Sequence, residues 1–224
     1  MFFKKRKDSF VAYAKKIRWM LDKGNHDMAL ARYDRLKDYY DLMDSEKQSM
    51  YESEFNSLMN QLILYLKLEE LDLLVKGDDI DLMRDGLNEV EYLLNETSGI
   101  SPSYFGFVNS KRKKLLKEFN CKLVMSELDS LLKKVHKLKD EQNFDQALHM
   151  FPKVMDKYKE LREYSSDTSE LYKQLMTLRD FLKMQLLEFE AHSKVAKVNV
   201  RTLKKSLKKK DPEGARALYK DIFG

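Results

Sequence analysis

The residues from which catalysis or metal binding would first be expected are four histidines and one cysteine. No two histidines are four residues apart, and neither the H-E-x-x-H nor the C-x-x-C spacing of zinc sites occurs. A single cysteine cannot form a disulfide within the chain, and we expect Cys121 to be a small buried residue on a helix rather than a nucleophile. We expect His26, in a turn, and His149, on a helix, to be exposed or partly packed. The sequence therefore predicts neither a metal site nor an enzyme.

Carboxylates are most concentrated in the stretch GDDID, residues 77–81. An EF-hand loop needs ligands spread over about 12 residues, a glycine at the sixth position and a terminal glutamate, and this stretch does not match. We interpret these acids as residues at a helix N-terminus, where the helix dipole favours negative charge. Because Gly-rich phosphate loops are also absent, we expect no cofactor and no small-molecule substrate.

The strongest chemical signal is a basic segment, KVAKVNVRTLKKSLKKK, which covers residues 194–210 and has eight basic residues and no acid. Val195, Val198, Leu203 and Leu207 run through it at near-helical spacing. Residues three or four apart share a helix face, which would align Lys194, Lys197, Arg201, Lys204 and Lys208. The candidate surface for a polyanionic partner is formed by Lys194, Lys197, Arg201, Lys204, Lys205, Lys208 and Lys209.

Three interpretations of the basic segment remain open. Its lysines can simply cover a solvated helix, or they can bind a phosphate-rich partner, either a nucleic acid or an anionic membrane surface. They can also dock on the first half of this or another copy, because residues 1–110 have a net charge of −5 and residues 111–224 of +10. A second basic cluster, Lys111 to Lys114, opens that second half. The scarcity of arginine and the lack of interleaved aromatics argue against base-specific reading of nucleic acid.

Apolar residues recur at steps of three and four along almost the whole chain, and no segment alternates convincingly over six residues. With only 7 glycines and 3 prolines in 224 residues, this pattern predicts an all-α protein of antiparallel helical hairpins with long helices. No apolar run approaches the ~20 residues of a membrane span, and the N-terminus is unlike a secretory signal, so we expect a cytoplasmic protein. Helices are predicted over residues 8–23, 27–43, 46–76, 79–94, 109–141, 144–164, 168–198, 200–209 and 212–223.

Helix-ending residues predict the boundaries. Gly24 and Gly77 can adopt the left-handed conformation that ends a helix, Asp44 can cap the next helix, and Pro152 should kink or split its helix. The breaker-rich stretch NETSGISPSYFGF, residues 95–107, separates two halves. Its aromatic residues lie in what reads as an exposed loop. They can pack onto the core, which we favour, or bind a partner. The predicted organisation is an N-terminal helical repeat unit at 1–100, a connecting loop at 101–110, and a C-terminal repeat unit with the basic helix at 111–224.

One short phrase occurs twice, 118 residues apart: GNHDMALARY at residues 24–33 and QNFDQALHMF at residues 142–151. In each copy we expect the asparagine to cap a helix by accepting a backbone N–H. The alanine four residues later should let that helix pack closely against the one before. This is the pattern of an αα-hairpin, and its recurrence predicts an internal duplication.

These phrases resemble the turn and second helix of tetratricopeptide-type hairpins, and MIT-type three-helix domains have a similar hairpin. The matching positions are Gly24, Asn25, Ala29 and Tyr33 in the first copy, and Asn143, Phe144, Ala147 and Phe151 in the second. The chain departs from tetratricopeptide arrays, which repeat about every 34 residues and have shorter helices. The resemblance implies a module that binds partner helices. We therefore expect a non-catalytic protein-interaction or scaffold protein, with phosphate binding through residues 194–210 as the alternative.

Overall fold

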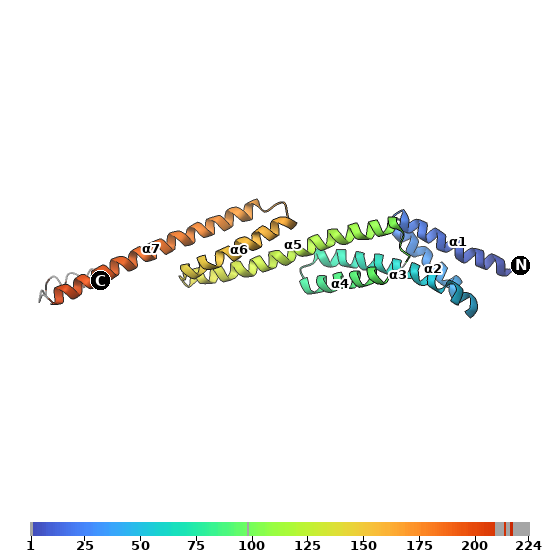
Figure 1. Cartoon of the computed structure of the whole chain (residues 1–224), viewed down its shortest axis with the longest axis horizontal. Helices are drawn as coiled ribbons and strands as arrows, with labels where there is room; N and C mark the ends of the chain where they lie inside the picture. The colour runs from blue at the N-terminus through green and yellow to red at the C-terminus, as the bar shows by residue number, and fades with distance from the viewer. Residues whose placement is uncertain (1, 98, 209–212, 214–215, 217–224) are drawn as a thin grey trace. The chain divides into compact units, whose positions relative to one another are not determined.

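The computed structural model describes residues 2–97, 99–208, 213 and 216. About 90% of the chain is helical, and the described residues form seven helices and no strand, which confirms the all-α prediction (Figure 1). None of the helices described is both long and apolar enough to cross a membrane. The helices are α1 (Phe2–Asp22), α2 (His26–Asp41), α3 (Ser45–Lys76), α4 (Ile80–Glu96), α5 (Pro102–Asp140), α6 (Phe144–Tyr164) and α7 (Ser169–Lys208).

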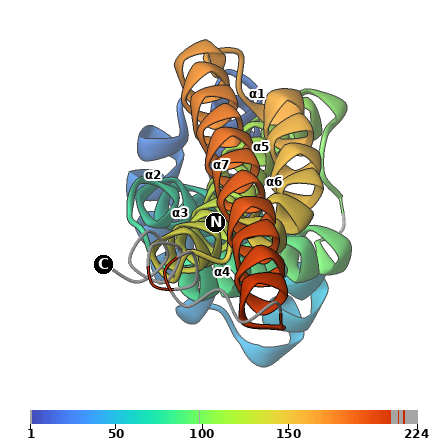
Figure 2. The same ribbon diagram turned by 90° about the vertical axis from the view of Figure 1, so that its left-hand side faces the viewer.

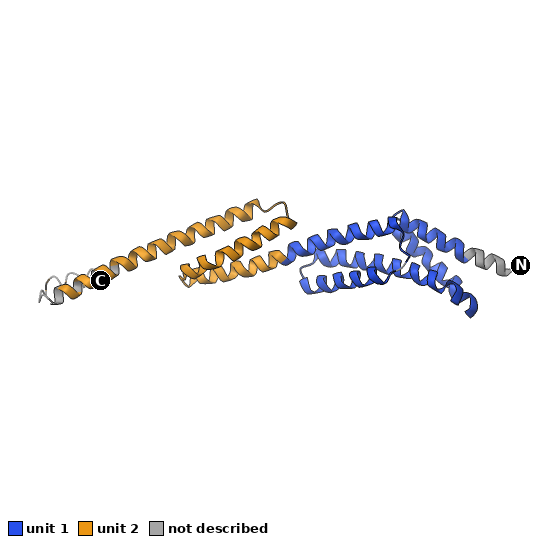
Figure 3. Ribbon diagram, in the orientation of Figure 1, with its two compact units in different colours: residues 1–123 blue, residues 124–224 orange. Residues whose placement is uncertain are grey.

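The chain divides into two compact units, residues 1–123 and 124–224 (Figure 3). The division lies within α5 and not in the predicted connecting loop at 101–110, which is helical from Pro102 onward. The hydroxyl oxygen of Ser101 accepts a hydrogen bond from the backbone N–H of Tyr104 at 3.2 Å. Pro102 takes the first helical position, where its missing N–H removes no bond. The Ser-Pro pair therefore starts a helix where the sequence pattern suggested a break.

In the first unit, α3 is the central helix. It contacts α1, α2 and α4, and Tyr104 at the start of α5 donates its hydroxyl proton to the carbonyl oxygen of Gln61 at 2.6 Å. Because neighbours lie on several sides, the buried residues of α3 do not form a single stripe. They include Tyr51, Phe55, Leu58, Leu62, Leu64, Leu68, Leu71 and Val75. Tyr104 is fully buried while Phe105 is 46% exposed, so only one of these two neighbouring aromatics tucks onto the core.

The second unit is a helical hairpin with a third helix laid along it. The ammonium of Lys157 on α6 pairs with Glu127 on α5 at 2.6 Å, and α6 packs against α7. These two helices lie side by side in both views (Figures 1 and 2). The apolar core of this unit is formed by Val124, Leu128, Val135, Ala147, Phe151, Val154, Tyr158, Leu161, Leu175 and Leu182.

Two helix interruptions that the sequence allowed in the second unit, a split at Pro152 and a break near residue 199, do not occur. Helix α6 continues through Pro152, and the predicted separate helices over 168–198 and 200–209 are one helix, α7. Asn199, at the expected break, is only a mildly unfavourable helix residue, so it does not end a long helix. The predicted helix over 212–223 lies outside the described residues except for Glu213 and Arg216.

The helix ends that were predicted at glycine and aspartate residues agree with the structure in part. Gly24 has φ +75°, in the left-handed region, and Asp44 caps α3 by accepting the N–H of Lys47 at 3.0 Å. Gly77, in contrast, is extended (φ −78°, ψ −172°), so its predicted left-handed conformation was wrong. Asp79 caps α4 by accepting the N–H groups of Asp81 and Leu82, which explains the acids of the GDDID stretch as helix-start residues.

The predicted asparagine caps of the repeated phrase were wrong. Neither Asn25 nor Asn143 makes a side-chain cap hydrogen bond. Each instead donates its backbone N–H to the carbonyl five residues back, Asn25 to Met20 at 2.8 Å and Asn143 to Leu138 at 2.9 Å. This is the six-to-one bond of the Schellman motif. The phrase therefore ends one helix through its backbone and starts the next.

Candidate functional site

Helix α7 has an anchored part and a projecting part. Up to residue 182 it packs on the hairpin: Leu175 and Leu182 are buried, and the rings of Tyr172 and Tyr158 lie 5.6 Å apart. From residue 183 to its end at 208, no side chain that the structure describes is buried. We call residues 183–208 the α7 arm. In Figure 1 the arm continues past the turn between α5 and α6.

Most of the predicted basic surface lies on the α7 arm. Lys194, Lys197, Arg201, Lys204 and Lys205 are all exposed. At 3.6 residues per turn they span about 100° of the helix circumference. Within the described part of the chain, no carboxylate pairs with any of these five side chains. Lys208 is the last residue of α7, and Lys209 lies outside the described residues.

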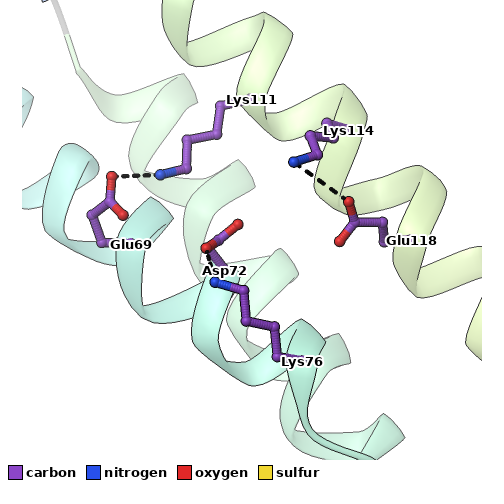
Figure 4. Close-up of polar contacts among 6 residues, drawn as sticks. All are labelled: Glu69, Asp72, Lys76, Lys111, Lys114 and Glu118. Atoms are coloured by element: carbon purple, nitrogen blue, oxygen red, sulfur yellow. Dashed lines mark hydrogen bonds and ion pairs between the residues drawn. The ribbon is translucent and has the colours of Figure 1, made fainter.

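In the other basic cluster, Lys111 to Lys114, three of the four residues pair with carboxylates of the first unit. Lys111 pairs with Glu69 on α3, and Arg112 pairs with Glu91 on α4 at 3.2 Å. Figure 4 shows the Lys111 pair beside two pairs that form within single helices, α3 and α5. These are Asp72 with Lys76 at 2.6 Å, and Lys114 with Glu118 at 3.7 Å.

The net charges of the two compact units differ from those of the two sequence halves divided at residue 110. Residues 1–123 have 21 basic and 21 acidic side chains, whereas residues 124–224 have 21 and 16. The entire net charge of +5 therefore belongs to the second unit. Division at residue 110 had separated the lysines at the start of α5 from the acids with which they pair. The first unit thus offers no net negative charge to attract the basic segment.

The α7 arm also has an exposed apolar stripe, which the sequence analysis missed. Six residues follow one another at steps of three and four, and all are exposed, with Met184 at 61% and Leu187 at 66%. The hydroxyl of the last one, Thr202, donates to the carbonyl of Val198 at 2.9 Å, so its donor is already used by the helix. The apolar stripe consists of Met184, Leu187, Ala191, Val195, Val198 and Thr202.

Further polar groups of the described chain lie in a cleft of the second unit and around Cys121. The described residues contain no group of three or more His, Cys, Asp or Glu side chains arranged to hold a metal ion. A cleft of about 460 Å³ between the end of α5 and α7 is lined by lysine, glutamate, amide and apolar side chains, with Phe181 at one side. Cys121 is half-buried and free.

His26 is the one histidine that the structure buries. Its ring lies 4.5 Å from that of Tyr65 and 4.2 Å from that of Phe107, measured between centroids. It is 6% exposed, so our expectation of an exposed or partly packed turn residue was wrong. Its Nε2 atom is buried and has no hydrogen-bond partner among the described residues. Burial lowers the pKa of His26, since charging a desolvated imidazole is unfavourable.

No protein-family model, curated protein or solved structure matches this chain. The resemblance of its hairpins to tetratricopeptide-type and MIT-type modules therefore remains a prediction, as does the internal duplication.

Proposed function

We propose that this chain is a non-catalytic helical scaffold that binds a partner protein through the α7 arm. The observation that carries this proposal is the apolar stripe, which lies exposed on a helix where none of the side chains described beyond residue 182 is buried. Contiguous exposed apolar surface of this kind marks interaction sites in soluble proteins. The anchored part of α7 would hold the arm while its stripe meets the partner.

The composition of the α7 arm supports the same proposal. An isolated helix gains little from hydrogen bonding alone, and most helical stability in proteins comes from packing an apolar face. The arm includes several β-branched residues, Val195, Val198 and Thr202 among them, which are weaker helix formers. Its basic side chains also face like charges three and four residues away, which further destabilises a helix. A partner that covers the stripe and neutralises the lysines would remove both penalties.

A second candidate function is phosphate binding through Lys194, Lys197, Arg201, Lys204 and Lys205. The observation that favours it is the shared exposed face of these five residues, without a carboxylate partner in the described chain. A polyanion bound there would release counterions, so its affinity would fall steeply as salt rises. A nucleic acid would, however, leave the apolar stripe in water, which is why protein binding is the first proposal.

Site-specific photo-crosslinking tests the proposed function. A photoreactive phenylalanine analogue replaces Leu187 on the arm or Leu73 on α3; these leucines are 66% and 68% exposed and so form a matched pair. In the protein's own cells we expect a discrete protein adduct from position 187 and none from position 73. The adduct should disappear when Val195→Asn is added, and the captured protein, once purified, should bind the full chain. Adducts with nucleic acid or lipid alone would support the second candidate instead.

A further inference from the structure

We infer that the partner of the α7 arm is an amphipathic helix with acidic side chains beside its apolar face. This inference rests on the proposed function and specifies the chemistry of the partner. It follows from the width and length of the apolar stripe, the small residue near its middle, and the sign of the charges beside it.

The apolar stripe has the dimensions of a contact between two helices. Its six positions run from Met184 to Thr202 with an average step of 3.6, so they stay on one side of a straight helix for about 27 Å. They span about 80° of the circumference, narrower than the apolar face of at least about 100° of a helix packed on a globular core. The bulky rings of Phe181 and Phe189 lie outside this arc. Membrane-surface helices gather such residues on their apolar face, so a membrane fits the stripe poorly.

The small side chain of Ala191 lies inside the stripe, flanked by Leu187 and Val195. A small residue at the middle of a helix face lets a second helix approach closely. The same residue type is fully buried at Ala29 in α2 and at Ala147 in α6, where helices of this chain pack on their neighbours. The stripe thus presents the kind of surface that the two hairpins bury within the protein.

The charges beside the stripe select the partner. Lys194 and Arg201 lie on one flank of the stripe, and Lys197 and Lys204 lie one step further round the helix. Between residues 191 and 208 the chain has no acid. The whole arm has seven basic and two acidic side chains, so a second copy would bring net positive charge against net positive charge in either direction, and like charges across an interface oppose association. A helix with glutamate or aspartate along the facing flank pairs with these cations and covers the stripe.

Fluorescence anisotropy with the full chain tests this inference. The probe is a labelled 21-residue helical peptide, a length of about 32 Å, with leucine at the stripe-facing positions and glutamate on both flanks. The control peptide has the same leucines and lysine in place of glutamate. We expect the acidic peptide to bind at least about tenfold more tightly at near-physiological salt, because complementary charge discriminates between partners. Equal binding of both peptides, or no binding of the acidic one, would overturn the inference.

Matched variants locate the contact. We expect Leu187→Asn and Arg201→Glu each to weaken binding of the acidic peptide about tenfold or more, whereas Leu73→Asn and Lys134→Glu leave it unchanged. All four side chains are exposed, so circular dichroism should show the same fold for each variant. Unchanged affinity in both arm variants would show that the peptide binds elsewhere and would overturn the inference.

The same titrations with single-stranded RNA and with phosphatidylserine vesicles separate the competing partners. Tight, salt-sensitive binding to either, abolished by Arg201→Glu but unaffected by Leu187→Asn, would replace the acidic helix by a polyanion. A protein adduct at position 187 without binding of the acidic peptide would overturn the partner chemistry alone. Absence of both the adduct and peptide binding would overturn the proposed function as well.

Discussion

The turn before α2 and the turn before α6 have the same backbone but different surroundings. Each ends the preceding helix with a left-handed residue, Gly24 (φ +75°) in one and Gln142 (φ +57°) in the other. Each then places a fully buried alanine four residues after the asparagine, at Ala29 and Ala147. The repeated phrase therefore specifies a local turn and a close helix packing, independently of what lies around it.

The surroundings differ at the residue after the asparagine. His26 begins α2 and is buried among aromatic rings from α3 and α5. Phe144 begins α6 at the corresponding position and is only half-buried. In the first unit other helices cover the turn, whereas the second unit covers it less. A buried polar ring thus occupies the more enclosed site, and a half-exposed apolar ring the more open one.

Overpacking the two alanines should give the largest effect. Because Ala29 and Ala147 are fully buried, Ala29→Leu and Ala147→Leu should each destabilise the protein by roughly 1–3 kcal/mol. Urea unfolding followed by circular dichroism measures this as a lower midpoint. Ala31→Leu, at an exposed position of α2, is the control and should leave the midpoint nearly unchanged. If Ala147→Leu also left it unchanged, the phrase would not mark a close helix packing.

Exchanging the left-handed residues should give a smaller effect of opposite sign in the two turns. Gln142→Gly should stabilise by about 0.5–1 kcal/mol, since glycine adopts positive φ without the strain of a side chain. Gly24→Gln should destabilise by about 1 kcal/mol for the same reason. A Cβ at Gly24 would meet no atom within 4 Å, so no clash confounds the comparison. Shifts of the same sign in both urea midpoints would contradict the shared turn geometry.

The sequence predicted most helices well because the apolar period and the helix ends agreed. The predicted bounds of α2, α3 and α6 lie within two residues of those observed. The start of α5 was missed because Ser101 and Pro102 occur in loops as well as at helix starts. The role of the asparagines was wrong because a backbone N–H and a side-chain oxygen can each satisfy a helix end, and the residue type does not distinguish them.

Of the two features of the candidate site, the sequence predicted the basic residues and not the apolar stripe. The lysines and arginine of the basic segment stood out by composition, because no acid interrupts them. The apolar stripe did not stand out in the sequence. Apolar residues at steps of three and four occur on buried helices as well as on exposed ones. Met184 and Leu187 became informative only when the structure showed that α7 extends beyond the helices that bury Leu175 and Leu182. Whether a periodic face is covered depends on contacts distant in the chain.

The pH dependence of stability should give the smallest effect near neutrality. Burial lowers the pKa of His26 below its usual 6.5; Glu69 and Asp27 oppose this shift and Lys111 adds to it. The rings of Tyr65, Tyr104 and Phe107 also face the imidazole. Well above pH 6.5 His26 is neutral in both the folded and unfolded states. As the pH falls below 6.5 the unfolded state binds the proton first, so the free energy of unfolding declines until the folded pKa is passed.

The variant His26→Phe gives the first turn a phenylalanine, the residue type that the second turn has at the corresponding position, Phe144. Urea midpoints measured between pH 7.5 and 5.5 should fall less steeply in this variant than in the unchanged protein, because the imidazole whose charging is disfavoured by burial in the folded state has been removed. His149→Phe, at an exposed position of α6, is the matched control and should keep the original slope. An identical slope in all three proteins would mean that His26 takes up its proton equally well in the folded and unfolded states. The aromatic shell around it would then not exclude the charge, and the two turns would differ in sequence without differing in electrostatics.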